Sequence, residues 1–219
     1  MNIAKRSGNK ITSFLKAYGP SNIKKLLWDK EFASTKWDFI DHTEGDCVYE
    51  NLEKYARNGS ILDLGCGPGN TANEVTDSAY QKYVGVDISE EALAKGRKRT
   101  IATGRESKNV FVRADFVNYT PIEKFDVILF RESMYHVPMG KIKSTLDRLS
   151  GYLKEGGVFV IRMYMSDGGG GPKEKPRPAA MMHIMETEFE VVQKNRYEKN
   201  RYDGERLPTV LVLRPKHRN

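Results

Sequence analysis

Short apolar segments alternate with longer segments of mixed polarity from about residue 61 to residue 161. Compact apolar runs bounded by turn residues are typical of buried strands, and apolar residues three or four apart are typical of helices that bury one face. The pattern predicts five strands, at 61–64, 83–87, 110–113, 125–130 and 158–161. Between them it predicts helices at 70–80, from an N-cap at Ser89 to Gly104, and at 139–153, the last closed by Gly156 and Gly157.

Strands that alternate with helices are joined by right-handed crossovers into a parallel sheet, so the core is predicted to be a doubly wound α/β fold. The tail departs from this alternation. Strand-like segments at 189–197 and 209–213 lie only about a dozen residues apart, too close for a long helix between them. We therefore expect an antiparallel pair there, preceded by a helix over 179–188.

Two segments lie outside the alternation. Residues 1–46 carry many large apolar side chains and predict an N-terminal helical cap, which leaves 47–219 as the main domain. Residues 166–178 contain four consecutive glycines and three prolines. Because this stretch follows the fifth strand, it emerges where ligands bind in open α/β sheets. It is either a flexible flap over the site or a surface insertion without a role.

The turn after the first predicted strand is the most informative stretch, Ile61-Leu-Asp-Leu-Gly-Cys-Gly-Pro-Gly-Asn70. Three glycines at alternate positions permit a tight turn and the close approach of a ligand to the backbone. Asp87 ends the second strand, 22 residues after Gly65, where a carboxylate can accept hydrogen bonds from both hydroxyls of a ribose. Asp87 alone also fits a helix cap, but the two features together predict a nucleoside-containing ligand.

The glycine spacing separates two classes of nucleoside-binding protein. A dinucleotide-binding turn reads G-x-G-x-x-G, and this chain has Asn70 in place of the third glycine, which disfavours a dinucleotide oxidoreductase. The motif Asp63-Leu-Gly-Cys-Gly-Pro-Gly69 resembles the first motif of the class I S-adenosylmethionine-dependent methyltransferases. The resemblance covers roughly residues 47–165 and includes Val84–Ser89, Ala114–Phe116, Phe125–Phe130 and Leu153–Phe159.

The resemblance implies a Rossmann-like, mostly parallel seven-stranded sheet with an antiparallel C-terminal strand pair. It also implies S-adenosylmethionine as the cofactor, with Gly65, Cys66 and Gly67 along its methionine and ribose. Asp87 would hold the ribose hydroxyls, and Ile88 would pack on the adenine.

Four further residues complete the implied cofactor site. Asp115 would accept a hydrogen bond from the adenine amine, and Phe116 would contribute its backbone N–H or its ring. Arg131 would lie near the methionine portion through its backbone. Asp63 would support the glycine loop or reach the cofactor ammonium through water. Cys66 is expected to be a small loop residue, because no group nearby in the sequence would activate it as a nucleophile.

The candidate catalytic residues are Glu132 and His136, which follow the fourth predicted strand. Methyl transfer from a sulfonium is an in-line displacement, so it needs a base only where the acceptor arrives protonated. The two residues are four apart and share a face if the segment is helical. His136 either takes a proton near neutral pH or packs as a structural histidine. Glu132 either binds a cationic acceptor or pairs with Arg131.

The candidate acceptor-binding residues are Trp28, Trp37 and Tyr135. The stretch from Trp28 to Trp37 resembles the Trp-rich cap of several small-molecule methyltransferases, which covers the cofactor and helps to form the acceptor pocket. Its indoles can also make cation–π contacts to a sulfonium or an amine. Core packing is the alternative for all three residues.

Two motifs that the chain lacks narrow the range of possible acceptors. The segment after the fourth strand lacks an Asn/Asp-Pro-Pro-aromatic motif, and the chain has no Pro-Cys dipeptide. These absences disfavour the enzymes that methylate amino groups of nucleic acids or of glutamine, and those that attack cytosine through a cysteine.

Composition further restricts the class of protein. The chain of 219 residues is 39% hydrophobic and 30% charged, which predicts one globular domain with a small addition. Its net charge of +7 favours anionic partners, but the basic residues are scattered, so nucleic acid is not expected. No run is long enough to span a membrane, and the start lacks the apolar stretch of a secretory signal. With only two cysteines, a reducing cytoplasm fits best.

The sequence thus predicts a cytoplasmic methyltransferase, monomeric or homodimeric and without a metal, that moves a methyl group to a nitrogen, oxygen or sulfur atom of a small molecule. Two alternatives stay open. The positive charge favours an RNA or protein methyltransferase, and the glycine loop fits equally a nucleoside-binding regulator without catalysis.

Overall fold

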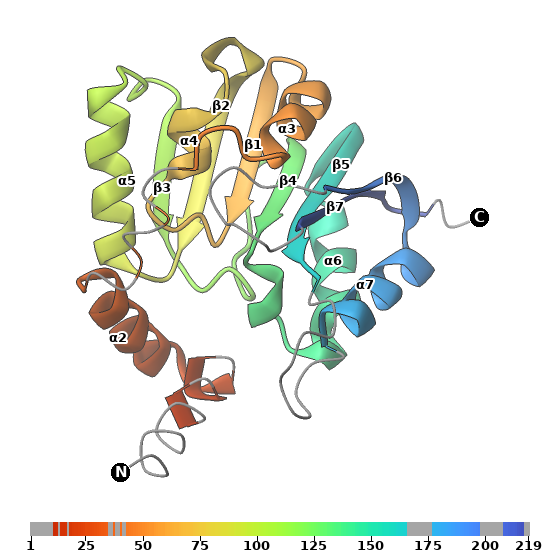
Figure 1. Ribbon diagram of the computed structural model, residues 1–219, viewed down its shortest axis with the longest axis horizontal. Coiled ribbons are helices and arrows are strands. Elements are labelled where there is room, and N and C mark those ends of the chain that lie inside the picture. The colour runs from red at the N-terminus through yellow and green to blue at the C-terminus, as the bar shows by residue number, and fades with distance from the viewer. Residues whose placement is uncertain are drawn as a thin grey trace.

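The computed structural model describes residues 11–12, 14–16, 18–34, 37, 40, 43–165, 177–197 and 208–216. The predicted flap at 166–178 falls almost entirely outside these residues, and only its last two, Arg177 and Pro178, are described, as the start of a helix. Within the described part, seven strands form one sheet with helices on both sides (Figure 1).

The strands follow the order β3-β2-β1-β4-β5-β7-β6 across the sheet. Their bounds are β1 (Gly59–Leu64), β2 (Tyr80–Asp87), β3 (Asn109–Arg113), β4 (Phe125–Arg131), β5 (Leu153–Tyr164), β6 (Glu190–Arg196) and β7 (Pro208–Arg214). Strands β1 to β5 pair in parallel, and β7 runs antiparallel to both β5 and β6. The predicted doubly wound α/β sheet is therefore confirmed. Its strand order reverses at β1, and ligands bind such sheets at this point.

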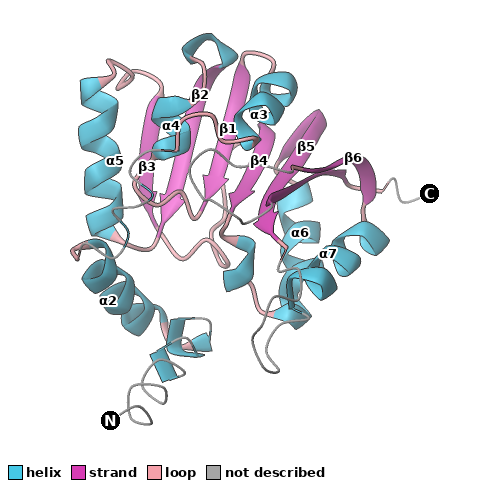
Figure 2. Ribbon diagram, in the orientation of Figure 1, coloured by secondary structure: helices cyan, strands magenta, loops and turns pink. Residues whose placement is uncertain are grey.

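Helices cover both faces of the sheet (Figure 2). One face packs against α3 (Val48–Ala56), α4 (Asn70–Glu74) and α5 (Glu90–Ala102), and the other packs against α6 (Ile142–Ser150) and α7 (Arg177–Glu188). Consecutive residues of a strand pack into the apolar layers on opposite faces of the sheet, because side chains alternate along a strand. In β4, Val127 packs in the layer of α3 and Ile128 packs in the layer of α6.

The helix predicted at 70–80 is wrong in its length. α4 ends at Glu74, Val75 turns to an extended conformation with φ −63° and ψ 148°, and a 3₁₀ turn at Asp77–Ala79 leads into β2. Tyr80 starts β2 and is buried, with its hydroxyl donating to a backbone carbonyl of α4 at 2.7 Å. The spacing of apolar residues does not reveal this break. The buried residues of α4 and of the start of β2 are spaced like those on one face of a single helix.

The last helix before β5 is also shorter than predicted. α6 begins at Ile142, after a 3₁₀ turn at Met139–Lys141, and ends at Ser150. Leu153 already belongs to β5, where it pairs with Phe125 of β4. The sequence predicts that Gly156 and Gly157 separate the helix from the strand, but both lie inside β5. Pairing with β4 already begins at Leu153, before these glycines.

The N-terminal segment lies across the carboxyl ends of β2 and β3. Its helix α2 (Ser21–Phe32) is held there by Asp29, whose carboxylate accepts hydrogen bonds from Ser89 Oγ and from the Arg113 guanidinium, each at 2.8 Å. The side-chain amide of Asn70 donates to the carbonyl of Ile40 at 2.6 Å. These contacts bring the segment over the glycine turn. A domain boundary at residue 46 stays a prediction.

Among the described helices, none has the length and apolar character that crossing a membrane requires.

Candidate active site

A cavity of about 410 Å³ lies between the carboxyl ends of the strands, the N-terminal segment and the loop after β4. This volume is typical of small-molecule sites. All fourteen residues predicted for the cofactor, the acceptor or catalysis line it, and they are Asp63, Gly65, Cys66, Gly67, Asp87, Ile88, Asp115, Phe116, Arg131, Glu132, His136, Trp28, Trp37 and Tyr135.

The glycine turn needs residues without side chains. Gly65, Gly67 and Gly69 have φ values of 83°, 53° and 72°, in the left-handed region that favours glycine. A Cβ on Gly65 would lie 2.5 Å from the Cβ of Ser133. A Cβ on Gly67 would meet only the Phe32 ring, at an ordinary contact distance of 3.8 Å, so this part of the backbone has room for an additional group. The turn therefore presents bare backbone to a ligand, as its sequence predicts.

Asp87 is buried beside this turn. Its Oδ2 accepts a hydrogen bond from Gly67 N and its Oδ1 accepts one from Ser89 N, both at 2.9 Å. Burial raises the pKa of Asp87, and these two backbone donors oppose that rise. Each carboxylate oxygen keeps a free lone pair, so the group can also accept hydrogen bonds from a diol.

Asp63 holds an unsatisfied acceptor at the base of the cavity. The Tyr83 hydroxyl donates to its Oδ2 at 2.7 Å, while its Oδ1 is buried and accepts no hydrogen bond from the described residues. Burial raises the pKa of Asp63 to about 6. Buried polar atoms without a partner are rare in folded proteins, and such an atom in a cavity fits a ligand that brings a donor.

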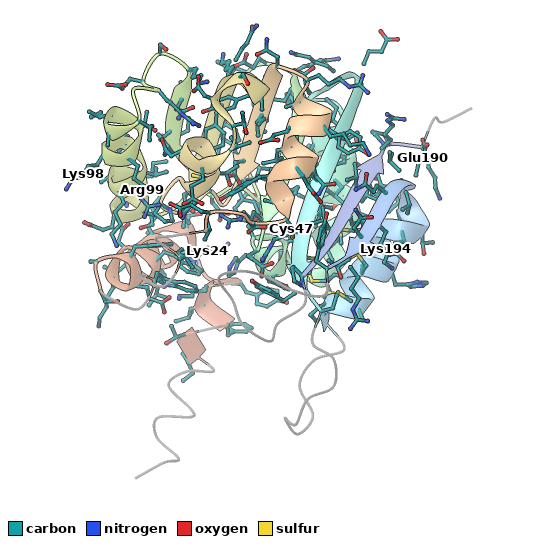
Figure 3. The ribbon with its side chains drawn as sticks, turned by 45° about the horizontal axis from the view of Figure 1, so that its top comes forward. Lys24, Cys47, Lys98, Arg99, Glu190 and Lys194 are labelled. Carbon is teal, nitrogen blue, oxygen red and sulfur yellow. The ribbon has the colours of Figure 1, made fainter. Side chains whose placement is uncertain are left out.

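Asp115 is occupied by a residue that the sequence did not single out. Its Oδ2 accepts a hydrogen bond from Lys24 Nζ at 3.0 Å, and its Oδ1 accepts one from Val117 N at 3.2 Å. Lys24, labelled in Figure 3, lies on the side of α2 that faces the sheet. A ligand amine at Asp115 would have to share the carboxylate with this ammonium. No pattern in α2 marks Lys24, because its partner lies 91 residues away.

A buried arginine lies behind the other end of the cavity. Arg162 of β5 has a fully buried side chain, which donates to Glu132 Oε1 at 2.8 Å, to Asp46 Oδ1 at 3.3 Å and to the Tyr164 hydroxyl at 2.8 Å. Sequence reasoning missed it. The available signal was a charged residue inside the apolar run of β5, since a charge there must be paired.

Arg131 is the last residue of β4. The alternative in which it pairs with Glu132 is wrong. Its Nε and Nη2 both donate to Asp46 Oδ2, at 2.9 Å and 2.6 Å. Asp46 therefore binds two arginines at once, since its other oxygen faces Arg162. Glu132 is left with Arg162 as its described partner.

The loop after β4 is not a continuous helix, so Glu132 and His136 do not share a helical face. Glu132 has a φ of 56°, unusual for a residue with a side chain, and only Met134–His136 form a 3₁₀ turn. Burial raises the pKa of Glu132 to about 7, while the positive charges of Arg162 and Arg131 oppose the rise and Asp46 adds to it. Its Oε2 accepts no hydrogen bond from the described residues, so one oxygen remains for a ligand.

The raised pKa of Glu132 predicts a stability that falls as the pH rises. The folded protein keeps a proton that the unfolded chain releases at its ordinary pKa of 4.5, so the stabilisation is present below pH 4.5 and is lost as the pH rises through about 7. Thermal unfolding across this range measures the decrease. Glu132→Gln should reduce it, leaving the smaller slope that the raised pKa values of Asp63 and Asp87 produce. An unchanged slope in the variant would contradict the assignment.

Aromatic rings form the wall opposite the glycine turn. The ring centroids of Trp28 and Trp37 are 6.0 Å apart, and His136 meets Trp28 edge-on at 5.0 Å with an interplanar angle of 87°. The Tyr135 hydroxyl donates to the carbonyl of Tyr164 at 3.0 Å. The N-terminal segment and the loop after β4 thus meet over the cavity.

The cysteines of the described part are unpaired, and neither suits a reactive role. Burial raises the pKa of Cys66 well above its usual range and that of Cys47 to about 12, so both thiols stay protonated. Across the described ranges, no group of three or more His, Cys, Asp or Glu residues is placed to hold a metal ion.

Comparison with known proteins identifies the family. A family model described as a methyltransferase domain matches residues 36–210. Protein-lysine N-methyltransferase EFM4 of Saccharomyces cerevisiae is 30% identical over 167 residues, covering 63% of this chain and 72% of that protein. Sterol 24-C-methyltransferase of Schizosaccharomyces pombe is 31% identical over 110 residues, which are 49% of this chain but only 28% of that larger protein.

Solved structures share the fold at low identity. The N-methyltransferase NodS of Bradyrhizobium japonicum, in complex with S-adenosyl-L-homocysteine, has a TM-score of 0.65 and 16% identity over 88% of this chain and 98% of its own. Magnesium protoporphyrin IX methyltransferase of Synechocystis, with bound S-adenosylmethionine, has a TM-score of 0.63 and 15% identity over 87% and 96% of the two chains. The matched domain, the glycine turn and this sheet place the chain in the S-adenosylmethionine-dependent class I methyltransferase family.

Proposed function

We propose that this protein transfers a methyl group from S-adenosylmethionine to a nitrogen, oxygen or sulfur atom of a small molecule by in-line displacement. The observation that carries the proposal is one cavity lined by two kinds of residue. The bare glycine turn, Asp63 and Asp87 suit a nucleoside, while Glu132, His136 and aromatic rings suit an acceptor. A methyltransferase needs this combination of a nucleoside site next to an acceptor site.

The described residues fit the proposed cofactor. Asp63 Oδ1 is a buried acceptor without a partner, which suits the ammonium of a methionine group. The backbone of Gly67 has room for an additional group, and Asp87 beside it suits the ribose hydroxyls. Asp115 suits the adenine amine, and Ile88 and Phe116 line the cavity as its apolar contacts. When bound, the cofactor supplies a methyl group already activated on a sulfonium.

The protein itself contributes position, exclusion of water and proton removal. The N-terminal segment lines one side of the cavity, so a bound acceptor would be held in a fixed orientation, which can account for much of the rate enhancement. Glu132 is the stronger candidate for the base, since its pKa of about 7 lets the carboxylate form at neutral pH. His136 packs edge-on against Trp28, which suits a role in shaping the acceptor site.

The limited size of the cavity also favours a small acceptor. Trp28 and Trp37 line the cavity, and its volume of about 410 Å³ must hold both the cofactor and the acceptor group. A protein side chain is the second candidate, favoured by the similarity to a protein-lysine N-methyltransferase. The two free cysteines suit a reducing compartment, so we place the protein in the cytoplasm. We also propose that it is a monomer or a homodimer.

Replacing Asp87 with alanine should weaken the binding of S-adenosylhomocysteine by ~1–3 kcal/mol, or about 5- to 150-fold, through the loss of charge-assisted hydrogen bonds. Isothermal titration calorimetry measures the affinity. The control is Asp77→Ala, which removes an exposed carboxylate bound to Lys108 and leaves the cavity intact. Equal affinities of the two variants, or no binding by the wild type, would remove the cofactor site from the proposal.

An acceptor screen with radiolabelled methyl donor tests the reaction. The expected result is transfer to a small molecule, and labelling confined to added proteins would instead support the second candidate. Cofactor binding with no transfer to any acceptor would favour a regulator without catalysis.

A further inference from the structure

The cavity has an aromatic wall that attracts positive charge. Trp28, Phe32 and Trp37 come from the N-terminal segment, and their ring centroids lie 5.9 to 6.0 Å apart. Tyr135 and Tyr164 line the cavity after β4 and at the end of β5. The faces of such rings carry partial negative charge and bind cations.

An ammonium group already lies on one of these rings. Lys16 Nζ is 3.8 Å from the centroid of the Trp28 ring and 2.5 Å from Glu31 Oε2, and its side chain is only 11% exposed. One aromatic face and one carboxylate therefore hold an ammonium at the edge of this cavity. A second carboxylate, Glu132, lines the cavity in the loop that brings His136 against Trp28.

The charges around the cavity favour a cationic acceptor over an anionic one. The described basic residues that line it are each paired with a carboxylate: Lys16 with Glu31, Lys24 with Asp115, and Arg131 with Asp46. Glu132, by contrast, lines the cavity and uses only one of its two oxygens on Arg162. A carboxylate or phosphate acceptor would meet Glu132 and aromatic faces, which repel it.

We propose that the acceptor is an amine, held as an ammonium between the free oxygen of Glu132 and the aromatic wall of Trp28 and Trp37. This inference rests on the proposed methyltransferase function and names its acceptor class. The Glu132 carboxylate takes a proton from the ammonium, which frees the nitrogen lone pair. The new N–C bond forms as the bond between methyl and sulfur breaks, with its electron pair left on sulfur as a thioether. The methylated product is itself an ammonium, because the nitrogen has given its lone pair to the new bond, and Glu132 releases the proton it took to water.

The test compares three probes that share a phenethyl group: phenethylamine, phenethyl alcohol and phenylpropionate. Each is titrated by calorimetry into the protein loaded with S-adenosylhomocysteine. We expect the amine to bind about tenfold more tightly than the alcohol, and phenylpropionate to bind most weakly, because only the amine gains the charged hydrogen bond and the cation–π contact. Glu132→Gln should abolish the preference. Glu155→Gln, which changes an exposed glutamate of β5, should keep it.

A second variant tests the inference even if Glu132→Gln does not fold. Trp37→Leu leaves the Glu132 ion pair in place and should reduce the preference for the amine. No binding of the amine, equal binding of amine and alcohol, or tighter binding of phenylpropionate would each overturn the inference. Binding of S-adenosylhomocysteine itself is measured in the same samples, so its loss would point to failure of the proposed function and its retention to failure of the amine assignment alone.

Discussion

Replacing Arg162 with methionine should destabilise the protein by about 3–5 kcal/mol, the typical cost of breaking a buried ion pair on one side. The side chain is fully buried and binds Asp46, Glu132 and the Tyr164 hydroxyl. Without it, Glu132 loses its described cation and Tyr164 loses a donor. Asp46 keeps Arg131. Urea unfolding followed by tryptophan fluorescence measures the change.

The control is Lys154→Met in the same strand, whose ammonium pairs with Asp126 while 45% of its side chain is exposed. Exposed ion pairs contribute about 0–1 kcal/mol, so this variant should remain close to the wild type. The loss of unfolding free energy in Arg162→Met should also be smaller at pH values below the pKa of Glu132. The glutamate can then take up a proton in place of its lost partner. Equal losses in the two variants would show that the buried network contributes no more than a surface pair.

Replacing Gly65 with alanine should weaken the binding of S-adenosylhomocysteine by about 100-fold or more. A φ of 83° already costs about 1 kcal/mol for alanine. The added Cβ would in addition lie 2.5 Å from the Cβ of Ser133, so the turn must move. Such a movement displaces the backbone on which the nucleoside is proposed to rest. Calorimetry with S-adenosylhomocysteine gives the affinity.

Gly104→Ala separates backbone strain from the clash. Gly104 has a φ of 66°, but its Cβ would meet nothing within 4 Å, and the residue follows α5 away from the cavity. This variant should lose stability while it keeps its affinity for the ligand. A Gly65→Ala protein that binds as tightly as Gly104→Ala would contradict the role of the glycine turn.

Most of the sheet was predictable because its signals are local. The apolar run at 61–64 and the carboxylate at Asp87 each mark a strand or its end without reference to distant residues. The Ser89 cap was likewise predictable, and its hydroxyl accepts from Ala92 N at 3.3 Å. The helix at 70–80 was too long because the residue that ends it, Val75, looks like part of an apolar helical face. Only pairing of Tyr80 with Gly59 shows that the chain has already entered β2.

The candidate site divides in the same way. Its glycines and acids follow strand ends, so the parallel fold alone brings Gly65, Asp87 and Asp115 to one edge of the sheet. The ion pairs among its charges were not predictable. Lys24 reaches Asp115 across 91 residues, and Arg162 reaches Asp46 across 116.

By itself the sequence determined the α/β class, the order of strands and helices along the chain, and the glycine turn with its nearby carboxylate. These features depend on backbone conformation and on the burial of short apolar runs, which neighbouring residues control. Only the tertiary structure decided which charges neutralise one another, and so which carboxylate oxygens remain for a ligand. The energy of an ion pair depends on distance and burial, and both arise when segments far apart in the chain are packed together.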